Sequence, residues 1–186
     1  MPKIIIIRHG ETTDNKDKIF SGNRDVDLTE EGIEEAKKIG EELKDEKITK
    51  AYQSNQLRSK HTLSLVLNDH HSNTEIFTDA RIRERDYGDL TGKSKIELEK
   101  KDPENFKLWH RSYDVAPPNG ESIKDVETRV MSFLYDVLPK LNPSDVVLIS
   151  AHGNSIRPMR KYFEGLSNEE MCFFVHEPGK IYSYEL

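Results

Sequence analysis

The sequence predicts an α/β fold, namely a three-layer αβα sandwich with a mainly parallel sheet. Two largely apolar runs, Ile4 to Ile7 and Asp145 to Ser150, each lead within a few residues to a His-Gly pair. A strand with no polar residue at its centre must be covered on both faces, as inner strands of a parallel sheet are. Helical patterns alternate with the predicted strands, which is typical of strands joined by crossover helices. We therefore expect helices on both faces of one sheet.

The first part of the chain has a clear helix start. The polar segment from Thr12 to Asp27 is expected to be a loop folded over the strand ends. Thr29 is suited to cap a helix with an acidic first turn and apolar residues on one face. Ile48 to Ser54 then has the composition of a second strand, and Gln56 to Asn68 that of a helix. Arg58 falls in the first turn of this helix, where phosphates are often bound, but position alone favours a solvated arginine equally.

The middle of the chain is more polar. Glu75 to Thr78 is expected to form a short strand. Arg81 to Gly92 is dense in charge and ends in glycine, so its spacing alone predicts a solvated loop. Ser94 to His110 has weak helical signals interrupted at Pro103, and Pro117 to Gly120 is a turn-forming stretch in which we expect a loop.

The last part of the chain contains the strongest helical pattern. Ser122 is suited to cap a helix whose apolar residues recur at intervals of three and four, and this helix leads into the second His-Gly strand. Asn154 to Glu164 is expected to be helical and to end at Gly165. Asn168 to Phe174 is expected to be a short helix, and Tyr182 to Leu186 an edge strand.

The residues at the ends of the two apolar runs are the best candidates for a functional site. Ligands bind beyond the carboxyl ends of the strands of a parallel sheet. Arg8 and His9 follow one run, and His152 follows the other. Gly10 is expected to let the backbone turn and bring a ligand close to its N–H groups. A single histidine at a strand end is more often structural, but two His-Gly pairs with an adjacent arginine favour a site.

Composition narrows the class of protein. The 186 residues predict a single domain spanning residues 1–186. The formal net charge of −6 and the pI near 5.7 disfavour nucleic-acid or anionic-membrane partners, so an anion site needs a local cluster of cations. The single cysteine, Cys172, argues against an internal disulfide and a cysteine-based zinc site. No apolar run approaches the roughly 20 residues of a membrane span or the core of a signal peptide, so we expect a cytoplasmic protein.

The same residues resemble a known family. Arg8 to Glu11 (Arg-His-Gly-Glu), together with Ala151 to Gly153 (Ala-His-Gly), is similar to the histidine phosphatase superfamily, and the likeness runs nearly from end to end. Within that superfamily, Glu84 to Lys95 (Glu-Arg-x-Tyr-Gly-x-Leu-x-Gly-x-x-Lys) and Trp109 to Asp114 (Trp-x-Arg-Ser-Tyr-Asp) resemble the cofactor-dependent phosphoglycerate mutases. The resemblance implies a phosphoglycerate mutase-like fold.

The resemblance also implies a chemistry. His9 is implied as the nucleophile that forms a phosphohistidine, and Glu84 as the group that gives and takes the proton of the substrate oxygen. The implied reaction interconverts 2-phosphoglycerate and 3-phosphoglycerate, with 2,3-bisphosphoglycerate as phosphoryl primer and no metal. The expected partner is a small phosphate ester, and the resemblance allows a homo-oligomer. The implied catalytic residues are Arg8, His9, Arg58, Glu84 and His152, and the implied substrate-binding residues are Asn15, Ser21, Gly22, Tyr87, Lys95, Arg111 and Asn154.

Three functions remain open at this level. The residues that would grip the non-reacting end of a phosphoglycerate favour the mutase. A metal-independent phosphatase acting on small phosphate esters is the alternative, because His110 stands where the mutases usually have an arginine beside the one matched by Arg111. The mutase tail that helps to cover the site also has no counterpart before Leu186, which leaves room for hydrolysis. A catalytically silent protein that binds a protein partner is disfavoured, since every reactive position holds a competent residue.

Overall fold

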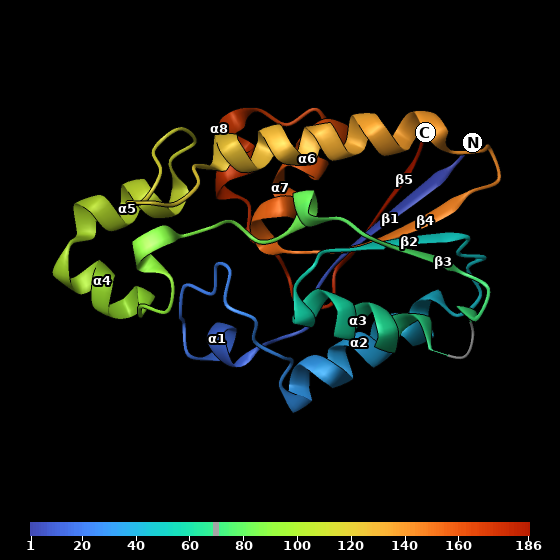
Figure 1. Cartoon of the computed structure of the whole chain (residues 1–186), viewed down its shortest axis with the longest axis horizontal. Coiled ribbons are helices and arrows are strands. Elements are labelled where there is room, and N and C mark those ends of the chain that lie inside the picture. Colours follow the sequence, from blue (N-terminus) through green and yellow to red (C-terminus); the bar gives the residue numbers. More distant parts are fainter. Residues whose placement is uncertain (69–70) are drawn as a thin grey trace.

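A single sheet forms the centre of the molecule (Figure 1). In the computed structural model, which describes residues 1–68 and 71–186, this sheet has five strands in the order β3-β2-β4-β1-β5. Strands β1 to β4 run parallel, and β5 pairs antiparallel with β1 at one edge. The predicted mainly parallel sheet is therefore confirmed. The strands are β1 (Lys3–Arg8), β2 (Lys50–Gln53), β3 (Glu75–Thr78), β4 (Val146–Ala151) and β5 (Ile181–Glu185).

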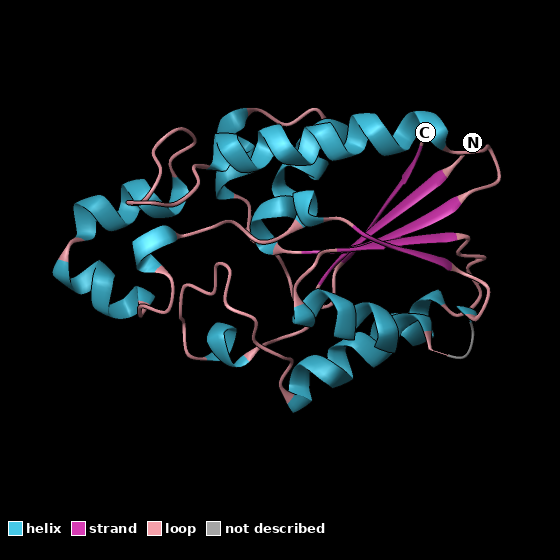
Figure 2. Ribbon diagram, viewed as in Figure 1, coloured by secondary structure: helices cyan, strands magenta, loops and turns pink. Residues whose placement is uncertain are grey.

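Helices cover both faces of the sheet, as Figure 2 shows. α2 (Glu30–Leu43) and α3 (Leu57–Leu67) lie on one face, and α6 (Ile123–Val137) and α7 (Gly153–Glu164) lie on the other. The isoleucines of β1 alternate between these layers. Two of them pack with the core of α2 and α3, and the other two pack with the core of α6 and α7. Burying such a side chain contributes roughly 1.5 to 3 kcal/mol, so the polar-free run specifies a central strand in a three-layer sandwich.

The remaining elements are short. They comprise α1 (Thr13–Lys16), α4 (Lys95–Lys101), α5 (Pro103–Arg111), α8 (Asn168–Phe173) and the 3-10 turns at Ala80–Ile82, Gly88–Leu90 and Leu138–Lys140.

Several helix ends follow the sequence signals. Thr29 Oγ1 accepts a hydrogen bond from the Gly32 N–H at 3.1 Å, which caps α2. Ser122 Oγ accepts one from the Asp125 N–H at 3.1 Å, which caps α6. Gly165 ends α7 in the left-handed conformation, with a φ of +67°. The predicted caps and the predicted stop are confirmed.

Two loop predictions are wrong. Thr12 to Asp27 contains α1, because Thr12 and Asn15 bind each other's backbone N–H groups and form a reciprocal cap, at 3.2 and 3.3 Å. Arg81 to Gly92 is not simply a solvated loop, because Arg85 is fully buried and Glu84 is only 9% exposed. The spacing of apolar residues did not predict α1, because a four-residue helix is too short to show an apolar repeat. It did not predict the burial of Glu84 and Arg85, because charged residues are rarely buried.

Candidate active site

His9 lies directly beyond β1, where its N–H donates to the Ala151 carbonyl at 3.0 Å. Its ring is 5% exposed, and Nδ1 lies 2.8 Å from the Gly10 carbonyl, so Nδ1 carries the proton and Nε2 is bare. Burial, followed by the charges of Arg8 and Arg58, holds the pKa of His9 well below its usual value. The ring is therefore neutral and has a free lone pair, as a nucleophile requires.

His152 lies beside His9, with 5.0 Å between the ring centroids. Its Nε2 is 2.7 Å from the Ser54 hydroxyl, and this hydroxyl already accepts the Gln56 N–H at 3.2 Å. A hydroxyl both donates and accepts, so this contact is compatible with a ring proton on either Nε2 or Nδ1. This Nδ1 is buried and has no hydrogen-bond partner among the described residues. Burial, followed by the charges of Arg58 and His9, lowers the pKa of His152, so its ring is neutral.

Gly10 packs tightly at the end of β1. Its N–H donates to Thr62 Oγ1 at 3.0 Å, so it is already used within the protein. A Cβ at Gly10 would lie 2.2 Å from the Gly32 carbonyl oxygen. The glycine is therefore needed for the close packing of the β1 end against α2.

Arg58 is fully buried in the first turn of α3, so a solvated position is excluded. Nη1 donates to the Arg24 carbonyl at 2.8 Å, and Nη2 donates to the Gly22 carbonyl at 3.1 Å. Its Nε is buried without a partner among residues 1–68 and 71–186. The Gly22 carbonyl also accepts from Gln56 Nε2 at 2.9 Å. The structure thus places Gly22 behind the site, where it orients Arg58.

Glu84 faces the start of α7. Its Oε1 accepts hydrogen bonds from Asn154, at 3.2 Å from the backbone N–H and at 3.0 Å from Nδ2. Asn154 Nδ2 is also 3.0 Å from the Tyr87 hydroxyl. The guanidinium of the neighbouring Arg83 binds Glu121 at 2.9 Å and makes no ion pair with Glu84. Three of the predicted residues therefore form one hydrogen-bonded group, with Glu84 as its carboxylate.

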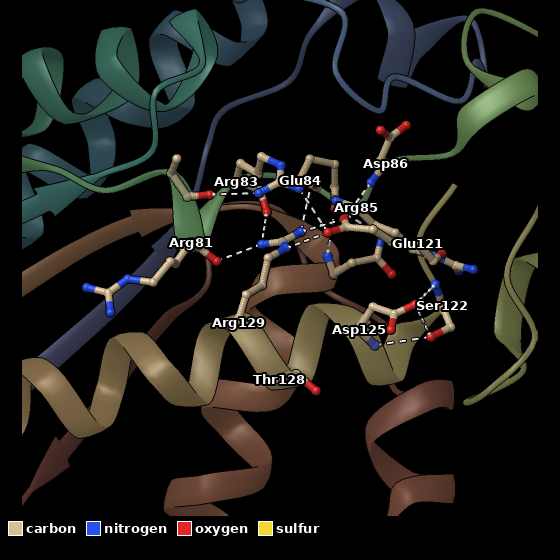
Figure 3. Close-up of polar contacts among 12 residues, drawn as sticks. Arg81, Arg83, Glu84, Arg85, Asp86, Glu121, Ser122, Asp125, Thr128 and Arg129 are labelled. Atoms are coloured by element: carbon tan, nitrogen blue, oxygen red, sulfur yellow. Dashed lines mark hydrogen bonds and ion pairs between the residues drawn. The ribbon is translucent and has the colours of Figure 1, made fainter. Parts of the chain in front are cut away.

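A partly buried ion pair holds the segment that carries Glu84 (Figure 3). Arg129 extends from α6 and pairs with Glu121 at 2.9 Å. The same guanidinium donates to the backbone carbonyls of Arg81, Arg83 and Glu84, at 2.6, 2.9 and 3.1 Å. One side chain thus fixes three carbonyls of an otherwise irregular segment. This explains how a charge-dense stretch is ordered beside the site.

Two cavities lie at the carboxyl edge of the sheet, and four residues line both of them. The nucleophile cavity, of about 320 Å³, contains His9. The distal cavity, of about 200 Å³, contains Ser21, Glu84, Tyr87, Arg111 and Asn154. Arg58, His152 and Gly22 line neither cavity and lie behind them. The residues common to both are Arg8, Asn15, Lys95 and His176.

Sequence reasoning missed some residues of the distal cavity. Arg157 lines it and is 3% exposed, and it could have been found because it follows Asn154 by three residues on α7. Burial and Arg111 lower the pKa of Arg157 to about 10. His110 also lines this cavity, and burial with Arg111 lowers its pKa to about 3. His176 lies in the loop before β5 and carried no sequence signal.

Neither a metal cluster nor a membrane helix was found in the part of the chain that the structure describes. No group of three or more His, Cys, Asp or Glu side chains there is placed to hold a metal ion. No helix there is both long and apolar enough to cross a membrane.

Comparison with known proteins identifies the family. The model for the histidine phosphatase superfamily (branch 1) matches residues 4–186. The chain therefore belongs to the histidine phosphatase superfamily. A protein of Afipia carboxidovorans named 2,3-bisphosphoglycerate-dependent phosphoglycerate mutase is 39% identical over 171 residues, which are 89% of this chain and 83% of that protein.

Solved structures show the same fold. Bacillus stearothermophilus YhfR superimposes with a TM-score of 0.90 at 26% identity, covering 100% of this chain and 92% of that one. An alpha-ribazole phosphatase from Shigella flexneri superimposes with a TM-score of 0.84 at 26% identity, covering 99% and 90%. Relatives by sequence and by structure thus carry names of two kinds, mutase and phosphatase.

Proposed function

We propose that the protein is a phosphoglycerate mutase that interconverts 2-phosphoglycerate and 3-phosphoglycerate and is primed by 2,3-bisphosphoglycerate. The observation that carries the proposal is the distal cavity. Lys95 and Arg111 supply cations to it, and Tyr87 and Asn154 supply polar groups beside Glu84. A mutase needs such a second anion site, because the intermediate bisphosphate must turn over without leaving. The name of the relative in Afipia carboxidovorans supports the same reaction.

The first transfer begins at His9. Its Nε2 attacks the phosphorus, the bond from phosphorus to the substrate oxygen breaks, and Glu84 protonates the departing alkoxide. The phosphoryl group then remains on His9. In the second transfer the free hydroxyl of a phosphoglycerate attacks this phosphoryl group, the bond from phosphorus to His9 breaks, and Glu84 takes the hydroxyl proton, which forms 2,3-bisphosphoglycerate. The two transfers together return Glu84 to its protonated state and His9 to its unphosphorylated state.

The charge on the transferring phosphoryl group is offset by Arg8, Arg58 and His152. Arg8 lines the nucleophile cavity beside His9, and its Nε is buried without a partner among the described residues. Arg58 and His152 lie behind this cavity. Arg58 Nε and His152 Nδ1 are also buried and have no hydrogen-bond partner among the described residues. Such preorganised donors contribute roughly 2.7 to 4 kcal/mol each to transition-state stabilisation.

The second candidate is a phosphatase that acts on small phosphate esters. One observation favours it: His110, whose pKa is lowered to about 3, is neutral where a second arginine would strengthen the anion site. The phosphatase name of the Shigella flexneri structure points the same way. In this case water replaces the second hydroxyl, and Glu84 takes its proton as the phosphohistidine is hydrolysed.

One assay separates the two candidates. The purified protein is given 3-phosphoglycerate with and without a catalytic amount of 2,3-bisphosphoglycerate, and 2-phosphoglycerate and free phosphate are measured together. The mutase proposal expects isomerisation that the bisphosphate stimulates and little free phosphate. Free phosphate without isomerisation would replace it by the phosphatase.

A further inference from the structure

His176 is placed like a ligand residue, although it lies outside every motif of the site. It belongs to the segment between α8 and β5 and lines both cavities. The other residues on this shared wall are Arg8, Asn15 and Lys95, which are all expected to touch substrate. A ligand that extends from His9 to Arg111 passes this wall, so His176 lies beside its path.

The contacts of His176 define its protonation state. Nε2 lies 2.6 Å from the Gly153 carbonyl, so this nitrogen carries the proton of the neutral ring. Nδ1 is buried and has no hydrogen-bond partner among the described residues, and it is therefore the atom that can take a second proton. A Cβ on Gly153 would lie 3.6 Å from His176 Cδ2 and 3.8 Å from Glu84 Oε2. The ring and the Glu84 carboxylate thus flank the same glycine.

The surroundings of His176 are strongly positive. Burial, followed by the charges of Arg157 and Arg8, lowers its pKa to about 3, so the ring is neutral near pH 6. An anion in the cavities would offset these charges and favour the protonated ring. The titratable and charged groups around it are Arg8 and His9 beside β1, Arg157 and Arg160 on α7, Tyr182 on β5, and Glu84.

We propose that His176 is a further ligand-binding residue, which takes up a proton from solvent when a ligand with two anionic groups fills both cavities. This inference rests on the proposed function and names the residue that adapts the site to a bisphosphate. Each phosphate carries about −1.5 to −2 charges, enough to offset several arginines. The imidazolium charge is shared by both ring nitrogens, so it acts on the cavity whichever nitrogen faces it. In the free protein the neutral ring adds no further positive charge beside Arg8 and Lys95, which line the same two cavities.

Proton uptake by His176 makes the affinity for the bisphosphate depend on pH. Proton uptake on binding makes binding tighter as the pH falls through the pKa of His176 in the complex. One pH unit below that pKa, the proton contributes about 10-fold in affinity. A ligand with one anionic group fills only part of the site and should show little of this effect.

The test uses calorimetry on full-length protein that carries His9→Ala, which prevents phosphoryl transfer. 2,3-Bisphosphoglycerate and phenyl phosphate are titrated at pH 6 in two buffers of different ionisation enthalpy, which reports the protons taken up. His176→Gln is added to this parent, because glutamine keeps an N–H donor for the Gly153 carbonyl but cannot titrate. His61→Gln is the matched control, since His61 lies on α3 and pairs with Asp27 outside both cavities.

We expect the parent and the His61→Gln protein to take up close to one proton more per bisphosphate than His176→Gln does. We also expect His176→Gln to bind the bisphosphate about 10-fold more weakly, with phenyl phosphate affinity and thermal unfolding unchanged. Equal proton uptake in all three proteins would overturn the role of His176 and leave the mutase proposal intact. If the parent binds bisphosphate no better than phenyl phosphate, the second anion site itself fails, and both proposals fall. A parallel loss for both ligands in His176→Gln would show a merely structural role.

Discussion

The Arg129 guanidinium on α6 donates a hydrogen bond to the backbone carbonyl of Glu84, 3.1 Å away. The same guanidinium pairs with Glu121, so the position of Glu84 depends on a partly buried ion pair on another element. Replacing Arg129 removes this ion pair and the charged donor of three backbone carbonyls, while Arg83 still pairs with Glu121 at 2.9 Å. We therefore treat Arg129 as a positioning residue.

Arg129→Met is expected to lower the free energy of unfolding by about 3 to 5 kcal/mol, as measured by urea denaturation, because three backbone carbonyls lose a charged hydrogen-bond donor. Because the Glu84 segment loses its anchor, kcat should fall more than KM changes at temperatures where the variant is folded. Arg160→Met is the matched control, since Arg160 pairs with Glu164 on α7. Normal kcat in folded Arg129→Met protein would contradict the positioning role.

His9→Ala is expected to abolish turnover and the acid-labile, base-stable phosphoenzyme. The reason is that His9 combines a bare Nε2 with a position in the nucleophile cavity. The measurement is retention of label from phosphorylated substrate, with His61→Ala as a control on the surface of α3. Recovery of the labelled intermediate in His9→Ala protein would refute the assignment.

Glu84→Gln tests proton transfer to the leaving oxygen. General acid catalysis contributes about 10² to 10⁴-fold, so the rate with 3-phosphoglycerate should fall by that factor. The loss with 4-nitrophenyl phosphate should be much smaller, because its leaving group departs without a proton. Glu99→Gln, on the exposed side of α4, controls for the loss of one charge. Equal losses on both substrates would point to a structural role for Glu84.

Arg111→Ala separates the grip on the second anionic group from the chemistry. A charge-assisted hydrogen bond contributes about 1.5 to 3 kcal/mol, so mutase turnover should fall about 10- to 150-fold more than hydrolysis of an aryl phosphate. His110→Arg is the complementary change and should tighten binding of 2,3-bisphosphoglycerate. Parallel losses on both substrates in Arg111→Ala protein of unchanged thermal stability would defeat the grip hypothesis.

The buried histidines predict how stability depends on pH. Burial lowers the pKa values of His9, His152, His110 and His176 in the folded protein, whereas each returns to about 6.5 on unfolding. Below pH 6.5 the unfolded chain thus binds more protons, and the free energy of unfolding falls by up to about 1.4 kcal/mol per pH unit for each histidine.

The effect of the histidines on the free energy of unfolding can be measured between about pH 4.5 and 6.5. The carboxylates with lowered pKa values, such as Glu121, lose their stabilising contribution only at lower pH, near and below about 4. Urea denaturation across this window should give a slope that becomes shallower in His110→Asn. Stability that does not change between pH 6.5 and 4.5 would contradict neutral burial of these rings.

Much of the fold could be read from local patterns. The polar-free run at Ile4 to Ile7 predicted a strand covered on both faces, and the structure confirms it because two of its side chains enter each helical layer. Thr29 and Ser122 marked helix starts because a hydroxyl just before an apolar repeat can accept a backbone N–H of the first helical turn. The strand order was not predicted, since pairing between distant segments leaves no local pattern.

The site was less predictable than the fold. The strand-end position of His9 and His152 is a local consequence of β1 and β4, so sequence located both. Arg157 and His176 reach the cavity only through the packing of α7 and of the segment before β5. Gly22 was expected on the cavity wall, but its carbonyl instead binds Arg58 and Gln56. Such choices depend on tertiary contacts that spacing does not encode.

The position of β1 in the sheet also bears on how the protein is made. β1 leaves the ribosome before the other four strands of this sheet, and its two neighbours, β4 and β5, are the last two of the five to be translated. Until Val146–Ala151 has been synthesised, four consecutive isoleucines have no sheet partner and form an aggregation-prone segment in the nascent chain. His9 therefore reaches its place beside His152 only after β4 has been synthesised. A chain released early has neither a paired first strand nor a working nucleophile.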